Sequence, residues 1–144
     1  DVETARASFE SKFWGPYSCA KFAAPKIKSG GSILFVSGAA GRKALPGFSA
    51  LTAACGAIES LTMQLAMELA PVRVNCLSPG VIDTPALDKV PEEQREAFKQ
   101  ACVEQLFIKH IGSSDEIAHA AAFLMENSYT TGSILNVDGG FVYS

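Results

Sequence analysis

Three short apolar segments alternate along the chain with longer segments in which apolar residues recur every three or four positions. The apolar segments are Ser32–Ser37, Val72–Leu77 and Ser133–Val137. Nearly continuous apolar runs of this length are typical of parallel strands covered on both faces. The spacing between them is that of amphipathic helices. Alternating helices and strands predict a parallel sheet with crossover connections, so the predicted fold class is α/β.

Two helices are predicted before the second strand. The first lies within residues 1–27 and has an apolar stripe of Phe9, Phe13, Tyr17, Ala20 and Ala24. Pro16 falls inside this segment and should kink the helix or divide it, because proline removes a hydrogen bond and clashes with the preceding turn. Residues 49–69 form the clearest predicted helix, since they contain no proline and keep apolar spacing throughout.

The last two helical segments differ in character. Residues 85–108 are polar and only partly helical in pattern, with Pro91 and two glutamates as a helix start that the helix dipole favours. Ser113 and Glu116 have the spacing of a capping box, so a helix is expected from there to about Glu126.

The number of strands bears on domain organisation. Residues 1–144 are expected to form a single domain. A doubly wound sheet normally has about five or six strands, however, and only three are predicted here. The chain also opens on a helix rather than a strand. We therefore predict a partial domain, the C-terminal half of a Rossmann-like doubly wound parallel sheet.

Composition excludes several classes of function. The net charge is −3 and the Lys and Arg residues are scattered, which argues against a nucleic-acid partner. The four cysteines show no C-x-x-C spacing, and neither a metal site nor a disulfide framework is expected. We find no basic-then-apolar leader and no apolar run near the roughly 20 residues of a membrane span. A cytoplasmic protein without a membrane partner is the expectation.

The segment after the second strand carries the first chemical signal. Ser78-Pro79-Gly80 follows the strand directly, and Ile82, Asp83 and Thr84 come next. The carboxyl end of a parallel strand is where α/β sheets bind their ligands. Pro79 makes this turn rigid, and Gly80 offers no side chain to obstruct a flat ring.

Four segments, in the right order, resemble the short-chain dehydrogenase/reductase family. They are residues 31–37, residues 56–70 of the long helix, Val72-Arg73-Val74-Asn75 with Ser78-Pro79-Gly80, and Thr131-Gly132 with Val137-Asp138-Gly139-Gly140. The resemblance implies a nicotinamide cofactor, NAD or NADP, bound at Pro79, Gly80, Ile82 and Thr84. In the family, the backbone at Ile82 and the hydroxyl at Thr84 hold the cofactor's carboxamide. The residues choosing between NAD and NADP, and the Gly-rich phosphate loop, would lie upstream of residue 1.

The resemblance fails at the catalytic residues. The family uses a Tyr, a Lys four residues later and a Ser at the preceding strand end, because residues at i and i+4 share a helix face and a cation stabilises a phenolate. In this register the positions hold Leu51, Cys55 and Gly38, with Ser37 one residue before the serine position. Leu51 cannot donate a proton, and a lone Cys55 in an apolar helix is most simply a packing residue.

Lys12 stands where the family usually carries an asparagine. One hypothesis is that its ammonium enters the cleft and replaces the missing cation; the other is that it extends to solvent from the helix flank. The candidate catalytic residues are therefore Ser37 and Lys12.

Two functions remain open. One is an NAD(P)-dependent oxidoreductase with an atypical site, acting on a small carbonyl or alcohol substrate beneath a mobile lid at residues 85–108. The other is an inactive relative that binds nucleotide or a partner subunit. In the family, the helix that starts at Ser49 and the one with Phe13 pack on a neighbouring subunit, which implies a homo-oligomer.

Overall fold

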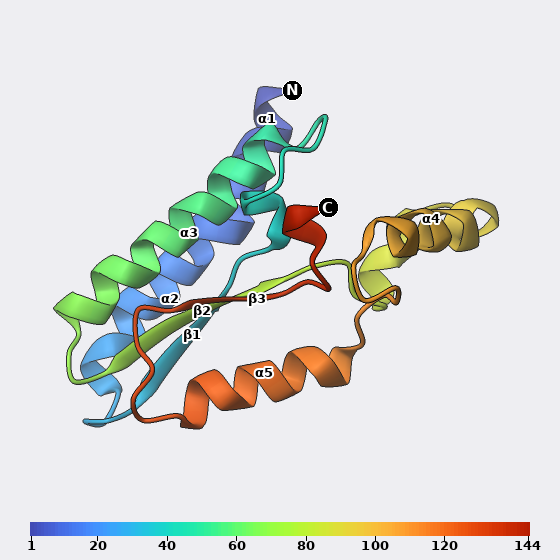
Figure 1. The fold of residues 1–144 in the computed structure, drawn as a ribbon. Coiled ribbons are helices and arrows are strands. Elements are labelled where there is room, and N and C mark those ends of the chain that lie inside the picture. Colours follow the sequence, from blue (N-terminus) through green and yellow to red (C-terminus); the bar gives the residue numbers. More distant parts are fainter.

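A three-stranded parallel sheet forms the centre of the molecule (Figure 1). The computed structural model describes residues 1–144. The strands are β1 (Ser32–Val36), β2 (Arg73–Pro79) and β3 (Ile134–Val137), and they lie side by side in chain order. The predicted parallel α/β sheet is confirmed. Strand β2 runs two residues beyond its predicted end, because Ser78 and Pro79 pair with β3.

Helices cover both faces of this sheet. Helix α3 (Ser49–Glu68) and the N-terminal helices lie on one face, and α5 (Ser114–Glu126) lies on the other (Figure 1). Side chains from α3, the N-terminal helix and the sheet meet in the main core, which is built on Ala20, Phe35, Ile58, Val74 and Cys76. By length and composition alone α3 would suit a membrane span, but it packs here as a core helix.

The N-terminal helix is divided before Pro16, as predicted. Helix α1 (Val2–Phe9) continues into a π-helical turn at Glu10–Trp14, and α2 (Gly15–Ala23) follows. A short 3-10 turn at Ala24–Lys26 completes the segment. The Gly15 N–H donates to the carbonyl of Glu10, five residues back. This wider turn suits the position ahead of a proline, whose ring would clash in a regular α-helix.

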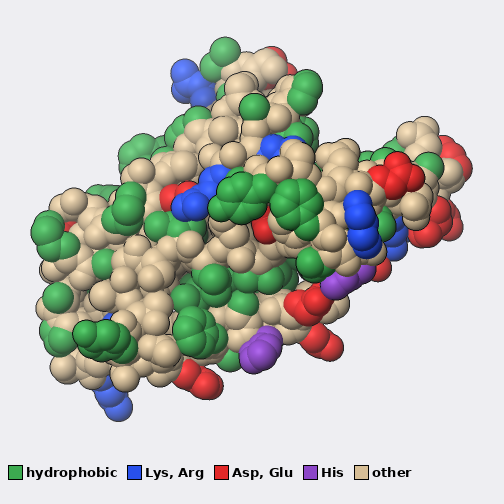
Figure 2. All heavy atoms as spheres, viewed as in Figure 1, with side chains coloured by type: hydrophobic (Ala, Val, Ile, Leu, Met, Phe, Trp, Pro, Cys, Tyr) green, Lys and Arg blue, Asp and Glu red, His purple; other side chains and the backbone are tan.

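Helix α4 (Glu92–Gln105) stands away from the rest of the molecule, together with a 3-10 turn at Pro85–Lys89 (Figure 1). Along α4 only Cys102 is buried. Acidic side chains gather over its outer part (Figure 2). The helix predicted from the glutamates after Pro91 is confirmed, and it begins one residue after that proline.

Helix α5 begins with the predicted capping box. The Ser113 hydroxyl accepts from the Glu116 N–H, and the Glu116 carboxylate accepts from the Ser113 N–H at 2.7 Å. Its carboxyl end is held by Arg73, which donates to the carbonyls of Leu124 and Met125. These contacts fix α5 against the sheet and so fix the loop that precedes it.

Candidate functional site

The turn that follows β2 is the centre of the candidate site. A Cβ at Gly80 would lie 2.7 Å from the Cα of Asp138. Only glycine therefore fits at Gly80, because the loop after β3 passes directly against it. This contact places the two sequence signals, Pro79-Gly80 and Asp138-Gly139-Gly140, at the same end of the sheet.

The main chain of Ile82 is free to bind a ligand. Its neighbours are anchored: the Asp83 N–H donates to the Gly112 carbonyl at 2.8 Å, and the Gly112 N–H donates to the Val81 carbonyl at 3.1 Å. Neither the N–H nor the carbonyl of Ile82 has a hydrogen-bond partner within the chain. A rigid main chain with one free donor and one free acceptor matches the pattern of a primary carboxamide.

Thr84 adds a hydroxyl two residues further on. Its oxygen accepts a long bond of 3.4 Å from the Ala86 N–H and caps the 3-10 turn at Pro85–Lys89. The hydroxyl proton itself is not donated within the chain, so it can be given to a ligand. The four residues predicted to bind the cofactor, Pro79, Gly80, Ile82 and Thr84, thus lie together in this one turn.

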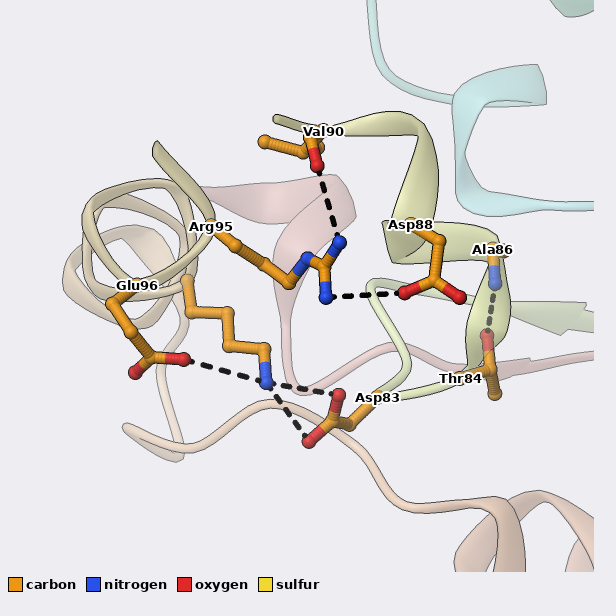
Figure 3. A network of polar contacts seen from close by, with 8 residues as sticks. Asp83, Thr84, Ala86, Asp88, Val90, Arg95 and Glu96 are labelled. Carbon is orange, nitrogen blue, oxygen red and sulfur yellow. Dashed lines mark hydrogen bonds and ion pairs between the residues drawn. The ribbon is translucent and has the colours of Figure 1, made fainter. Parts of the chain in front are cut away.

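Two ion pairs join this turn to α4 (Figure 3). The Lys99 ammonium lies 3.0 Å from the Asp83 carboxylate, and the Arg95 guanidinium lies 3.2 Å from that of Asp88. Arg95 also donates to the Val90 carbonyl. The network sets the position of α4 relative to Thr84, although both acidic partners are exposed and screened by solvent.

An apolar hollow lies between the turn and α5. Its lining includes Val81, Ile82, Ile117 and Val137, with His110 and Glu116 beside them. The His110 ring lies 3.0 Å from the Glu116 carboxylate. This hydrogen bond raises the pKa of His110, while the Ser113 N–H, His110 and the Ser113 hydroxyl lower the pKa of Glu116 to about 2.

Gly38 follows β1, whereas Leu51 and Cys55 lie on α3. A Cβ at Gly38 would lie 3.8 Å from the Cys55 Sγ, an ordinary contact, and the backbone of Gly38 is extended. Cys55 is buried in α3, and Leu51, one turn earlier, is half-buried against α1. Burial raises the pKa of the Cys55 thiol, which keeps the thiol protonated at neutral pH.

Lys12 lies in the π-helical turn, half-buried and without an ion-pair or hydrogen-bond partner. Its charge acts to lower the pKa of Cys55, against the larger effect of burial. π-Helical turns inside helices are frequent at functional sites.

Ser37 is buried and already has a partner. Its hydroxyl donates to the Glu59 carboxylate at 2.9 Å, and the other Glu59 oxygen accepts from the Arg42 guanidinium at 2.9 Å. Sequence reasoning missed Glu59 and Arg42. The available signal was that Glu59 follows Cys55 by one helical turn and so shares its helix face.

The structure contains no candidate metal site. No three His, Cys, Asp or Glu side chains lie close enough together to hold a metal ion.

The comparisons with known proteins agree with this geometry. A family model described as enoyl-(acyl carrier protein) reductase matches residues 1–142. The short-chain dehydrogenase/reductase ATR9 of Stachybotrys chlorohalonatus is 38% identical over 109 residues, which cover 76% of this chain and 43% of that protein. The 3-oxoacyl-[acyl-carrier-protein] reductase FabG of Thermotoga maritima is 35% identical over 116 residues, 78% of this chain and 46% of that protein. The chain belongs to the short-chain dehydrogenase/reductase family.

A solved structure gives the same result. A small-chain dehydrogenase in complex with NADPH is 39% identical, with a TM-score of 0.97 over 100% of this chain and 66% of that one. This chain spans about half the length of the curated relatives that it matches.

Proposed function

We propose that this chain is part of an NAD(P)-dependent oxidoreductase of the short-chain dehydrogenase/reductase type, acting on a small carbonyl or alcohol substrate. The observation that carries the proposal is the free main chain of Ile82 beside the Thr84 hydroxyl. The similar structure holds NADPH. The cofactor, when bound, supplies or accepts the hydride. Residues 1–144 would be the C-terminal part of the domain.

Pro79, Gly80, Ile82 and Thr84 are proposed to bind the nicotinamide end. The Ile82 N–H and the Thr84 hydroxyl would donate to the carboxamide oxygen, and the Ile82 carbonyl would accept from the amide nitrogen. Asp83 and Gly112 keep this main chain in place through their own hydrogen bonds. The turn therefore holds its donor and acceptor before the ligand arrives, which lowers the entropic cost of binding.

Lys12 is proposed as the cation of an atypical site. It is half-buried and unpaired, and its charge reaches Cys55. Ser37 is proposed to act through Glu59, because its hydroxyl is committed to that carboxylate. Neither residue supplies the proton donor that Leu51 lacks. In carbonyl reduction the proton would then come from water, and in alcohol oxidation the hydroxyl proton would leave to water.

A binding titration on the full-length protein tests the cofactor site. NADH and NADPH fluorescence are measured with the unchanged protein and with Thr84→Val, which keeps the shape but removes the hydroxyl. Loss of that bond should weaken binding about tenfold, near the upper range for one hydrogen bond. Thr4→Val serves as the control, because Thr4 lies in the exposed helix α1, about 80 residues before Thr84 in the sequence. Equal affinity of Thr84→Val and the unchanged protein would refute the assignment of Thr84.

The second candidate is a relative without catalysis, which binds nucleotide or a partner subunit. The observation in its favour is that Gly38, Leu51 and Cys55 carry no group able to transfer a proton at neutral pH. A screen of carbonyls and alcohols separates the two: binding without turnover supports this second function. Turnover that is lost in Lys12→Met, with nucleotide binding kept, supports the atypical enzyme.

The triple variant Gly38→Ser, Leu51→Tyr, Cys55→Lys introduces the family's three catalytic residue types. It therefore helps to distinguish an atypical enzyme from a relative without catalysis. Gly38 tolerates a side chain, since its backbone is extended and the added atom meets only an ordinary contact. Turnover that appears only in the triple variant would show that the scaffold is intact and the chemistry absent in the natural chain.

The partner and location are proposed on separate grounds. Exposed hydrophobic side chains occur in the π-helical turn, in α2 and in α3, and a second copy of the protein would cover them: Trp14, Phe22, Met63 and Met67. The four cysteines are free thiols in the structure, which fits the reducing cytoplasm.

A further inference from the structure

Two buried oxygen atoms at the carboxyl end of the sheet have no hydrogen-bond partner. They are the Ser78 Oγ, in a residue with 0% exposure, and the Asn136 Oδ1. Buried polar atoms are almost always hydrogen-bonded, because an unpaired one loses its water without compensation. Two such atoms in one place therefore point to a bound group.

The two residues are direct neighbours across the sheet. Ser78 and Asn136 are register partners in the β2–β3 ladder, so their side chains leave the sheet on the same face. That face is the one covered by α3, because Cys76 and Ile134, two residues earlier on each strand, pack with Ile58 of α3. The orphan oxygens thus lie under α3.

The surrounding polar groups are already engaged elsewhere. Ser37, on the same face of the neighbouring strand end, donates to Glu59, and Glu59 is paired with Arg42. The Thr62 hydroxyl donates to the Ile58 carbonyl within α3. The hydroxyl protons of Ser37 and Thr62 are therefore already donated and cannot reach Asn136, and the Ser78 Oγ has no acceptor within hydrogen-bonding distance.

We propose that one internal water molecule binds between Ser78 and Asn136. The water accepts the hydroxyl proton of Ser78 and donates to the Asn136 Oδ1. Because a water both donates and accepts, it satisfies either orientation of the Asn136 amide. Buried waters typically have two to four protein partners, and this site supplies two on rigid strands. The site lies behind the turn that begins at Pro79 and stiffens the strand end that carries it.

A high-resolution crystal structure of the full-length protein tests the proposal directly. The expected result is a water peak within hydrogen-bonding distance of both the Ser78 Oγ and the Asn136 side-chain amide. A direct bond between these two side chains, with no water, would overturn the proposal. This measurement does not depend on the nicotinamide site, so it fails or succeeds independently of the proposed function.

A double-mutant cycle gives a second measurement. Ser78→Ala and Asn136→Val each remove one partner of the water, and each should lower the melting temperature. If one water links them, the double variant loses less than the sum of the two losses. The control pair is Ser78→Ala with Thr62→Val, whose hydroxyl bonds its own helix, and its losses should add. Additive losses in the Ser78–Asn136 pair would count against the bridging water.

Discussion

At the scale of single residues, Gly80 and Gly56 form a matched pair of glycines with opposite expected behaviour. A Cβ at Gly80 would lie 2.7 Å from the Asp138 Cα, whereas one at Gly56 in α3 would meet nothing within 4 Å. Gly80→Ala should destabilise the protein by about 1–3 kcal/mol through overpacking. Gly56→Ala should stabilise it by about 0.5–1 kcal/mol, because alanine loses less entropy in a helix.

Urea unfolding of the two glycine variants measures both changes. A Gly80→Ala variant as stable as the unchanged protein would show that the loop after β3 moves away at little cost. The turn would then be less rigid than its contact with Asp138 indicates.

The pair of His110 and Glu116 predicts a pH window for the start of α5. The raised pKa of His110 gives a contribution that is complete below the unfolded value of 6.5 and lost as pH rises through the folded value. The pKa of Glu116, lowered to about 2, gives a contribution that is complete above 4.5 and lost as pH falls toward 2. The pairing is therefore strongest between about pH 4.5 and 6.5.

NMR titration of the His110 ring checks this window. The pKa of His110 should lie above the ordinary histidine value of 6.5, and Glu116→Gln should return it toward that value. Asp115→Asn, on the same turn of α5 but without a bond to His110, serves as the control. A His110 pKa unchanged by Glu116→Gln would contradict the assignment of the shift.

Local and distant signals differ in how well single residues could be predicted. The capping box of Ser113 and Glu116 is confirmed, because its spacing is contained in four consecutive residues. The bonds from Ser37 and Arg42 to Glu59 were missed, because they join residues about twenty positions apart through the tertiary fold. Ser37 keeps its place as a candidate, but its hydroxyl has a partner that spacing could not reveal.

At the scale of elements, α4 packs mainly against the 3-10 turn that precedes it and is weakly anchored to the sheet. It buries only Cys102, whereas α3 buries five residues under the sheet. Its amide protons should therefore exchange faster with solvent than those of α3. Lys99→Met should increase exchange across residues 85–105 further, since it removes the ion pair with Asp83.

The Lys99→Met effect should be modest, because an exposed ion pair contributes about 0.2–1 kcal/mol. Lys28→Met serves as the control, since Lys28 is exposed and forms no ion pair. Hydrogen exchange measured by mass spectrometry compares the three proteins. Equal exchange in α4 and α3 would show that α4 is fixed by contacts other than these ion pairs.

Most elements could be predicted because hydrophobic spacing reports burial directly. The three apolar segments became β1, β2 and β3, and the predicted helix at 49–69 became α3. The π-helical turn before Pro16 was not foreseen, although a break there was predicted from the proline. The outward position of α4 could not be predicted either, because the polar pattern of a helix does not identify the elements that it packs against.

At the scale of the whole molecule, two parts of the structure differ in how tightly their neighbours constrain them. The turn at residues 79–84 needs glycine at Gly80, because Asp138 packs directly against it. Gly38 is not constrained in this way, since a Cβ there would meet the Cys55 Sγ only at 3.8 Å. Packing of the first kind made family membership predictable from the sequence, whereas activity depends on side-chain chemistry that packing does not determine.

The outer edge of β1 gives the last prediction. Strand β1 pairs only with β2, and Val36 at its end is 50% exposed. An unpaired apolar edge is a template for pairing with another chain. Residues 1–144 produced alone should therefore self-associate, and Val36→Lys should reduce this association in size-exclusion chromatography with light scattering. Phe98→Lys on α4 makes the same charge change away from both the edge and the exposed face of α3, and should leave the association unaltered. A reduction by Met67→Lys alone would instead assign the contact to the helical face.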